Sequence, residues 1–427
     1  MGIAGRRGRV PAVVAALGAL LLLGGAVAPA ATAETMRERE WYLDRMRAPA
    51  MWKLSTGKGI TVALLDTGVI PTVPELTGKV LKGKNFMEPE RGADKDANGH
   101  GTAMAMLIAG NGANGQGVKG LAPDARILPL TVWGTTKEAG FRRVDALVDA
   151  LRYAADSEAR IIDIRVSFPT YIDDDERDSL KEAVDYAIGR GKLLLTDTGD
   201  TAEDGNDVTY PAAIPGVVGV GAVDKTGTVT KFSAYGPQVA LAAPGADIPI
   251  RCLEGKPGYC RGQGTGQAAA IASASAALIW SLHPDWTGNQ VLRVLMNTAA
   301  RPSTGTVPSR YLGYGTVRPR LAVLEDPGDP GPADVNPLIA AHEATTPSVS
   351  PSPSAPTPSA NPSGRSFPDA TPIPVEDAGQ GPGNTAVRIV TGTVAAAAVA
   401  LGAVLLARRR KRPARITEYG VDYTRER

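Results

Sequence analysis

The chain has 427 residues, enough for one large domain with appended segments. Its 43% hydrophobic and 21% charged residues are ordinary for a globular protein. The formal net charge of +2 gives no electrostatic reason for nucleic-acid binding, and the five Phe and 11 Tyr do not form base-stacking platforms. Nucleic acid is therefore not an expected partner.

The N-terminal segment 1–33 has the pattern of an export signal. Arg6, Arg7 and Arg9 precede an apolar run from Val13 to Val27, and a small-residue cleavage site follows at 31–33. The mature chain would then begin near Glu34. The alternative is an uncleaved membrane anchor, against which the cleavage site argues.

Apolar runs and helical patterns alternate through the next three hundred residues. Short strands are expected at 60–65, 160–166, 192–195, 217–223 and 239–243, and a turn followed by a strand at 120–130. Helices are expected at 41–53, 144–155 and 177–190. This alternation predicts an α/β fold, with a mostly parallel sheet covered by helices on both faces. The acidic run 173–176 could be a cation site, but the first turn of the following helix is the favoured interpretation.

Two polar motifs lie at element ends. Asp66 follows the strand at 60–65, where a parallel sheet places functional groups, and His100 precedes an apolar helix. Each motif is weak alone, because such groups are more often structural. The other two histidines, His283 and His342, lie in a helix-connecting turn and near a linker.

The stretch 262–270 is a glycine-rich turn that opens onto a run of small residues from Ile271 to Ile279. Such a run favours a closely packed, buried helix, whose N-terminus can stabilise an anion. Just before it lie the two cysteines, Cys252 and Cys260. In an exported chain these are expected to form a local disulfide, the alternative being two free thiols.

The C-terminal part changes in composition. Residues 326–385 are rich in Pro, Ser and Thr and are expected to be an extended, disordered linker. The uncharged segment 389–407 is about 28 Å long as a helix, enough to span a bilayer, and the basic tail 408–427 would stay cytoplasmic. A buried core helix is the alternative for 389–407.

Taken together, Asp66-Thr67-Gly68, His100-Gly101-Thr102 and Gly264-Thr265-Gly266 resemble the Asp, His and Ser motifs of the subtilisin-like serine proteases, in that order. The resemblance covers about residues 41–324. It implies a subtilisin-like three-layer peptidase domain over 34–325, with Asp66 and His100 as catalytic residues. No cofactor is expected; members of this family often bind calcium, but no calcium loop stands out here.

The resemblance also shows departures from the family. Gly266 stands at the nucleophile position, where loss of the serine lowers kcat about 2 × 10⁶-fold in subtilisin, or roughly 8–9 kcal/mol. Asp200 stands where the family has an oxyanion-hole asparagine, whose loss costs about 10²–10³ in kcat. Arg165 stands in the strand that lines the cleft, which it is expected to change or fill. Ser273, Ser275 and Thr265 are not placed to replace the missing nucleophile.

The order of signal, peptidase-like domain, linker, spanning segment and basic tail is similar to the mycosins, membrane-anchored subtilases of type VII secretion. It implies a cell-membrane location, with the domain outside and the tail in the cytoplasm. We expect an inactive or strongly impaired pseudoprotease that binds a type VII secretion complex or exported peptides. The alternatives are an active serine endopeptidase that cleaves exported proteins, and a decayed gene product without function.

Overall fold

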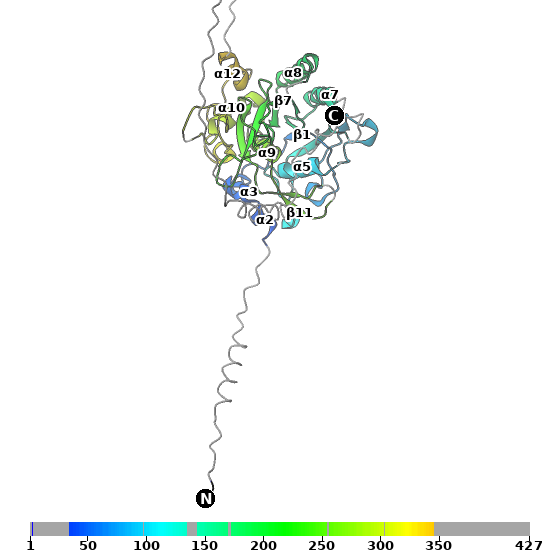
Figure 1. The fold of residues 1–427 in the computed structure, drawn as a ribbon, viewed down its shortest axis with the longest axis vertical. Coiled ribbons are helices and arrows are strands. Elements are labelled where there is room, and N and C mark those ends of the chain that lie inside the picture. The colour runs from blue at the N-terminus through cyan, green and yellow to red at the C-terminus, as the bar shows by residue number, and fades with distance from the viewer. Residues whose placement is uncertain are drawn as a thin grey trace, which may run out of the picture. The chain divides into compact units, whose positions relative to one another are not determined.

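The computed structural model describes residues 2, 34–96, 98–134, 143–169, 172–253, 256–302 and 304–345. Its centre is a sheet with the strand order β2-β3-β1-β4-β6-β8-β9 (Figure 1). The strands are β1 Thr61–Asp66, β2 Lys84–Asn85, β3 Arg126–Thr131, β4 Ile161–Ile164, β6 Leu193–Asp197, β8 Val218–Val223 and β9 Val239–Pro244. Every neighbouring pair is parallel, so the predicted α/β class and parallel sheet are confirmed.

Helices cover both faces of this sheet. One face packs against α5 His100–Ala109 and α9 Thr265–Leu282, with α10 Gly288–Thr298 and α11 Pro319–Leu324 behind α9. The other face packs against α7 Arg143–Asp156 and α8 Asp174–Gly189 (Figure 1). Because the sheet is buried on both sides, its strands are continuous apolar runs in which successive side chains enter opposite cores.

Helix α8 begins earlier than expected. Asp173 accepts a hydrogen bond from the Glu176 amide and caps the helix, so Asp174, Asp175 and Glu176 form its first turn. Carboxylates are favourable there because they face the positive end of the helix dipole. The interpretation of the acidic run as a helix start is confirmed.

The expected helix at 41–53 is divided into two. Helix α3 Trp41–Arg45 ends before Arg47, whose φ of 58° is left-handed, and α4 Ala48–Met51 follows. A left-handed residue cannot continue a right-handed helix, which explains the break. The short helix α2 Met36–Arg39 precedes them with a capping box. Single 3-10 turns occur at η1 Pro74–Leu76, η2 Pro89–Arg91 and η3 Ala113–Gly115.

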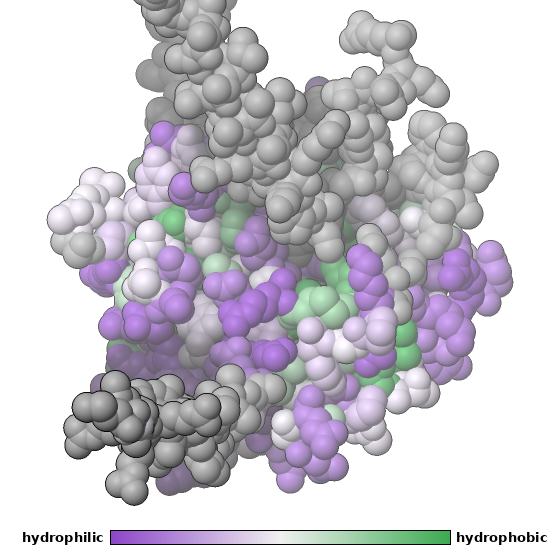
Figure 2. Space-filling model, turned by 60° about the horizontal axis from the view of Figure 1, so that its bottom comes forward, coloured by the Kyte–Doolittle hydropathy of each residue, from purple (hydrophilic) through white to green (hydrophobic). Residues whose placement is uncertain are grey.

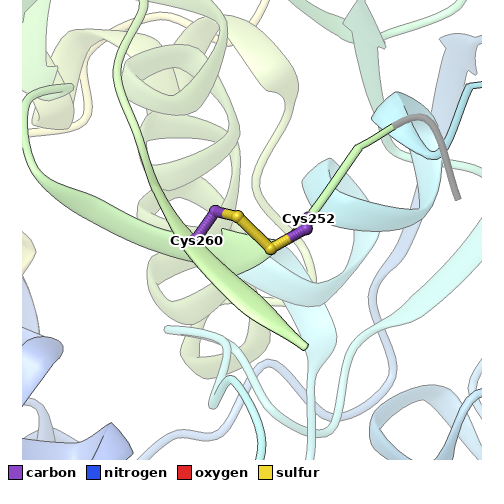
Figure 3. The surroundings of a disulfide bond; sticks show 2 residues. All are labelled: Cys252 and Cys260. Carbon is purple, nitrogen blue, oxygen red and sulfur yellow. A yellow bond between two sulfur atoms is a disulfide. The ribbon is translucent and has the colours of Figure 1, made fainter. Parts of the chain in front are cut away.

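Two small antiparallel pairs complete the domain. Strand β5 Phe168–Pro169 pairs with β7 Thr209–Tyr210, and β10 Ile248–Arg251 pairs with β11 Tyr259–Gly262. Figure 3 shows the Cys252–Cys260 disulfide, which closes the second hairpin with a Cα–Cα distance of 5.0 Å. That distance lies within the usual range for a disulfide. The predicted local disulfide is confirmed.

The compact unit ends at Thr345, the last residue that the structure describes. Helix α12 Pro337–Thr345 lies inside the segment expected to be an extended linker, so that expectation is wrong for these residues. Asn336 starts the helix by accepting hydrogen bonds from the amides of Leu338 and Ile339, and Pro337 is favourable at the first helical position.

The export signal at 1–33, the remainder of the linker to 385, the spanning segment at 389–407 and the tail at 408–427 lie outside the described residues, apart from residue 2. Within the part of the chain that the structure describes, no helix has both the length and the apolar character to cross a bilayer.

Candidate active site

An aspartate and a histidine meet at the carboxyl edge of the sheet. Asp66 is the last residue of β1, and His100 is the first residue of α5. The His100 Nδ1 atom lies 2.8 and 2.9 Å from the two Asp66 carboxylate oxygens, and both side chains are at least nine-tenths buried. An Asp that holds Nδ1–H leaves Nε2 as the proton acceptor of a neutral ring, which is the arrangement of a general base.

A second aspartate, not predicted from the sequence, fixes this geometry. Asp96 accepts hydrogen bonds from the Thr67 hydroxyl at 2.7 Å, the Gly99 amide at 2.8 Å, and both the amide and the hydroxyl of Thr102. It therefore ties the residue after Asp66 to the first turn of α5. The available signal was an Asp shortly before a turn, where its side chain commonly bonds the following amides.

A glycine permits the close approach of β1 and α5. A Cβ atom at Gly101 would lie 2.2 Å from the Gly68 carbonyl oxygen and 3.2 Å from the Asp66 carboxyl carbon. The first distance is far below van der Waals contact, so any other residue would force the helix away from the strand. The glycine after His100 therefore helps to set the distance between the two functional side chains.

Gly266 lies in the first turn of α9, fully within the core. Helices α5 and α9 pack against each other and against the same face of the sheet, which brings the motifs of Asp66, His100 and Gly266 to one region of the fold. The Gly266 carbonyl accepts a hydrogen bond of 3.1 Å from Arg165. Gly266 has no side chain that could attack a substrate.

Asp200 caps helix α9 from another part of the chain. Its Oδ1 atom accepts hydrogen bonds from the Thr265 amide at 2.8 Å and from the Thr265 hydroxyl at 2.9 Å. The same hydroxyl accepts from the Gly199 amide at 3.2 Å. A fixed carboxylate thus lies at the positive end of α9, one residue before Gly266. This placement stabilises the helix and opposes a second negative charge beside it.

Arg165 is fully buried beneath the start of α9. Its guanidinium lies between two carboxylates, those of Asp163 in β4 and Asp197 at the end of β6. Residues 163, 165 and 197 share the sheet face that carries Asp66, because side chains alternate along a strand. Arg165 therefore alters the buried wall of the site and does not fill the cleft.

Burial raises the pKa of Asp163, whereas Arg165 and the Ser273 hydroxyl oppose that rise and the charge of Asp66 adds to it. Three carboxylates and one guanidinium share a region without solvent, so the positive charge of Arg165 offsets repulsion between its neighbours. Arg165 stood out in the sequence, whereas Asp163 and Asp197 have the pattern of ordinary strand residues and were not predicted.

Two of the three hydroxyls considered as replacement nucleophiles are bound elsewhere, and the third is buried. Ser275 donates to the Ile271 carbonyl of its own helix at 2.8 Å, whereas the Ser273 hydroxyl makes no hydrogen bond among the described residues. Both are fully buried along α9. Thr265 is bound to Asp200. Among the described residues, no three His, Cys, Asp or Glu side chains are grouped to hold a metal ion.

This fold and this site define an α/β protein with an Asp–His pair of the serine-peptidase type. The subtilase family matches residues 57–315, and the chain belongs to that family. The chain is 35% identical over 243 residues to the major intracellular serine protease of Bacillus subtilis, covering 55% of this chain and 73% of that protein. It is 31% identical to subtilisin Savinase of Lederbergia lenta, covering 66% and 97%.

Solved structures of type VII secretion proteases are similar in fold. The crystal structure of MycP1 from Mycobacterium smegmatis matches with a TM-score of 0.61 and 27% identity, covering 69% of this chain and 86% of that one. The MycP3 protease of the ESX-3 type VII secretion system matches with a TM-score of 0.59 and 29% identity, covering 66% and 87%. The chain is thus structurally close to this group of peptidases.

Proposed function

We propose that the chain is an exported, membrane-anchored, mycosin-like pseudoprotease, whose peptidase-type domain binds or scaffolds other proteins. The observation that carries the proposal is the start of α9. Gly266 lies in its first turn, at the position that the sequence resemblance assigns to the family nucleophile, and the Asp200 carboxylate is bound to the adjacent Thr265. Acyl transfer needs a nucleophile and donors for the oxyanion, and by this assignment the chain lacks both.

The charge of Asp200 makes this arrangement unfavourable for hydrolysis by other means. His100 could still activate a water molecule as a general base. The tetrahedral intermediate would then develop negative charge near a carboxylate that already accepts two hydrogen bonds at the N-terminus of α9. Repulsion between the Asp200 carboxylate and the developing oxyanion raises the barrier to hydrolysis, whereas an asparagine at position 200 lowers it.

The sequence outside the described residues supports the membrane part of the proposal. Segment 1–33 has the features of an export signal, and 389–407 is uncharged and long enough to span a bilayer before a basic tail. The likeness to MycP1 and MycP3 supports a type VII secretion complex, or peptides exported by one, as the partner.

The second candidate is an active serine endopeptidase, and the intact His100–Asp66 pair favours it. The two are separated by treating the purified full-length protein with a fluorophosphonate probe and a broad peptide library, beside His100→Ala. We expect no adduct and no cleavage above the variant. An adduct, or cleavage that His100→Ala abolishes, would show an active peptidase and overturn the proposal.

A further inference from the structure

A pocket of about 540 Å³ lies away from the Asp–His pair and is lined by four arginines. They come from three separate segments: Arg45 from α3, Arg301 from the turn after α10, and Arg318 and Arg320 from the start of α11. The side on which α2 and α3 lie in Figure 1 comes forward in Figure 2, where hydrophilic residues cover much of the surface.

The cations of this pocket are poorly neutralised by the described residues. Arg318 donates to the carbonyls of Thr298 and Ala299, both at 2.9 Å, and Arg45 donates to the Thr226 carbonyl at 3.4 Å. Carbonyl groups orient a guanidinium but carry no net charge. Only Arg320 has a carboxylate within salt-bridge distance among the described residues, that of Glu325 at 3.6 Å.

The carboxylate of Asp224, which lines the pocket, already accepts hydrogen bonds within its own turn. Its Oδ1 atom accepts from the Thr226 amide and hydroxyl and from the Thr228 amide. Four guanidiniums are therefore accompanied by two carboxylates, Asp224 in the pocket and Glu325 beside Arg320. Burial and the nearby charge of Arg320 lower the pKa of Arg318, as expected where positive charges gather.

The remaining walls are apolar. They include Val223 and Pro244, the last residues of β8 and β9, and the ring of Trp41, whose indole N–H is held by the Ala246 carbonyl at 3.2 Å. Guanidiniums bind carboxylates in a planar, bidentate geometry, and an aromatic wall accepts an apolar side chain. The pocket thus combines the two kinds of contact that an acidic, partly apolar peptide needs.

We propose that this pocket is a docking site for an acidic segment of a partner polypeptide, in which carboxylates alternate with apolar side chains. Arg318 and Arg320 are only partly exposed inside the pocket, so a group must enter it to reach them. A flat layer of lipid headgroups does not enter, which favours a peptide over an anionic membrane. None of the pocket residues belongs to the Asp66, His100 or Gly266 motifs, so the site is independent of peptidase activity.

The test uses the full-length protein in a neutral detergent and a fluorescein-labelled peptide of alternating glutamate and leucine. Fluorescence anisotropy should show binding that weakens as salt is added, since exposed charges are screened. Arg301→Gln should weaken binding about threefold, and Arg301→Gln with Arg320→Gln about tenfold or more. The matched control is Arg310→Gln, an exposed arginine outside this pocket, which should bind like the wild type.

Three results would overturn the proposal. One is equal binding of a peptide in which glutamine replaces glutamate. Another is equal affinity of the double variant and the wild type, with the single Arg301→Gln variant as the check if the double variant does not fold. The third is absence of peptide binding while phosphatidylglycerol vesicles bind in an arginine-dependent way, which would indicate a membrane instead. The proposed lack of peptidase activity predicts none of these three results. The docking proposal and the pseudoprotease proposal can therefore be refuted independently.

Discussion

Restoring the chemistry at the start of α9 should convert the chain into a peptidase in two separable steps. Gly266→Ser supplies an oxygen nucleophile close to the His100–Asp66 pair. Asp200→Asn replaces a carboxylate by an amide whose oxygen can still accept from the Thr265 amide, a bond of 2.8 Å in the present structure. The new NH₂ group is then a donor for the oxyanion.

The expected magnitudes differ between the steps. A nucleophile in a competent triad is worth about 10⁶ in kcat, so Gly266→Ser determines whether acyl transfer occurs at all. One oxyanion donor is worth about 10²–10³ in kcat, or roughly 3–4 kcal/mol of barrier. Removal of the Asp200 charge adds to this gain. We therefore expect Gly266→Ser with Asp200→Asn to exceed Gly266→Ser alone by at least about 10²-fold.

The assay is single-turnover labelling with a fluorophosphonate probe, together with cleavage of a chromogenic peptide ester. An ester reports weak activity because acylation is intrinsically easier than with an amide. Adding His100→Ala to the double variant is the control and should abolish the rate. Equal rates for the single and double variants would show that Asp200 does not lie at the oxyanion, and turnover by the wild type would refute the reasoning about Gly266.

Three further variants test the interactions that stabilise the fold. Arg165→Met leaves two buried carboxylates without their cation and should lower the free energy of unfolding by about 3–5 kcal/mol, measured in urea; a change below 1 kcal/mol would contradict the buried cluster. Burial raises the pKa of Glu40 to about 7 from 4.5, so folding binds its proton more tightly and this stability is lost as pH rises through about 7. Glu40→Gln should therefore stabilise the protein by about 3 kcal/mol at pH 8 and have little effect at pH 4, as shown by thermal unfolding; equal gains at both pH values would contradict this. Replacing both Cys252 and Cys260 by Ser should cost about 2–3 kcal/mol, whereas a reductant should destabilise the wild type and leave that variant unchanged.

The fold was predictable because its signals are local and repeated. Apolar runs ending in polar groups recur along the chain, and each became a parallel strand whose carboxyl end lies at the same edge of the sheet. The pairing of His100 with Asp66 followed from motif order and was found at hydrogen-bond distance. The helix at Pro337–Thr345 was missed because the surrounding Pro, Gly and Ser residues dominate the composition.

The rest of the site could not be read from the sequence because it depends on tertiary contacts. Asp96 acts on Thr67 across 29 residues, and Arg165 reaches Asp197 across 32 residues. Nothing in the local pattern at Asp163 or Asp197 indicates that a guanidinium lies between them. The sequence resemblance placed Asp200 at the asparagine position of the family, but it could not indicate that its carboxylate caps a helix that begins 65 residues later.

The persistence of Asp66 and His100 beside Gly266 has a structural explanation. The Asp66 carboxylate is almost fully buried, and it accepts hydrogen bonds from the Thr67 amide at 2.6 Å and from His100. A substitution at His100 would leave that carboxylate short of a donor in a region that already contains Asp163 and Asp197, and an unsatisfied buried charge is strongly destabilising. By contrast, position 266 contributes only backbone to the interactions described at the site, through the carbonyl bound by Arg165. Under the proposed function, a glycine in place of serine there removes the nucleophile without removing support from the core. The Asp66–His100 pair is then kept for folding, which is consistent with the proposed pseudoprotease.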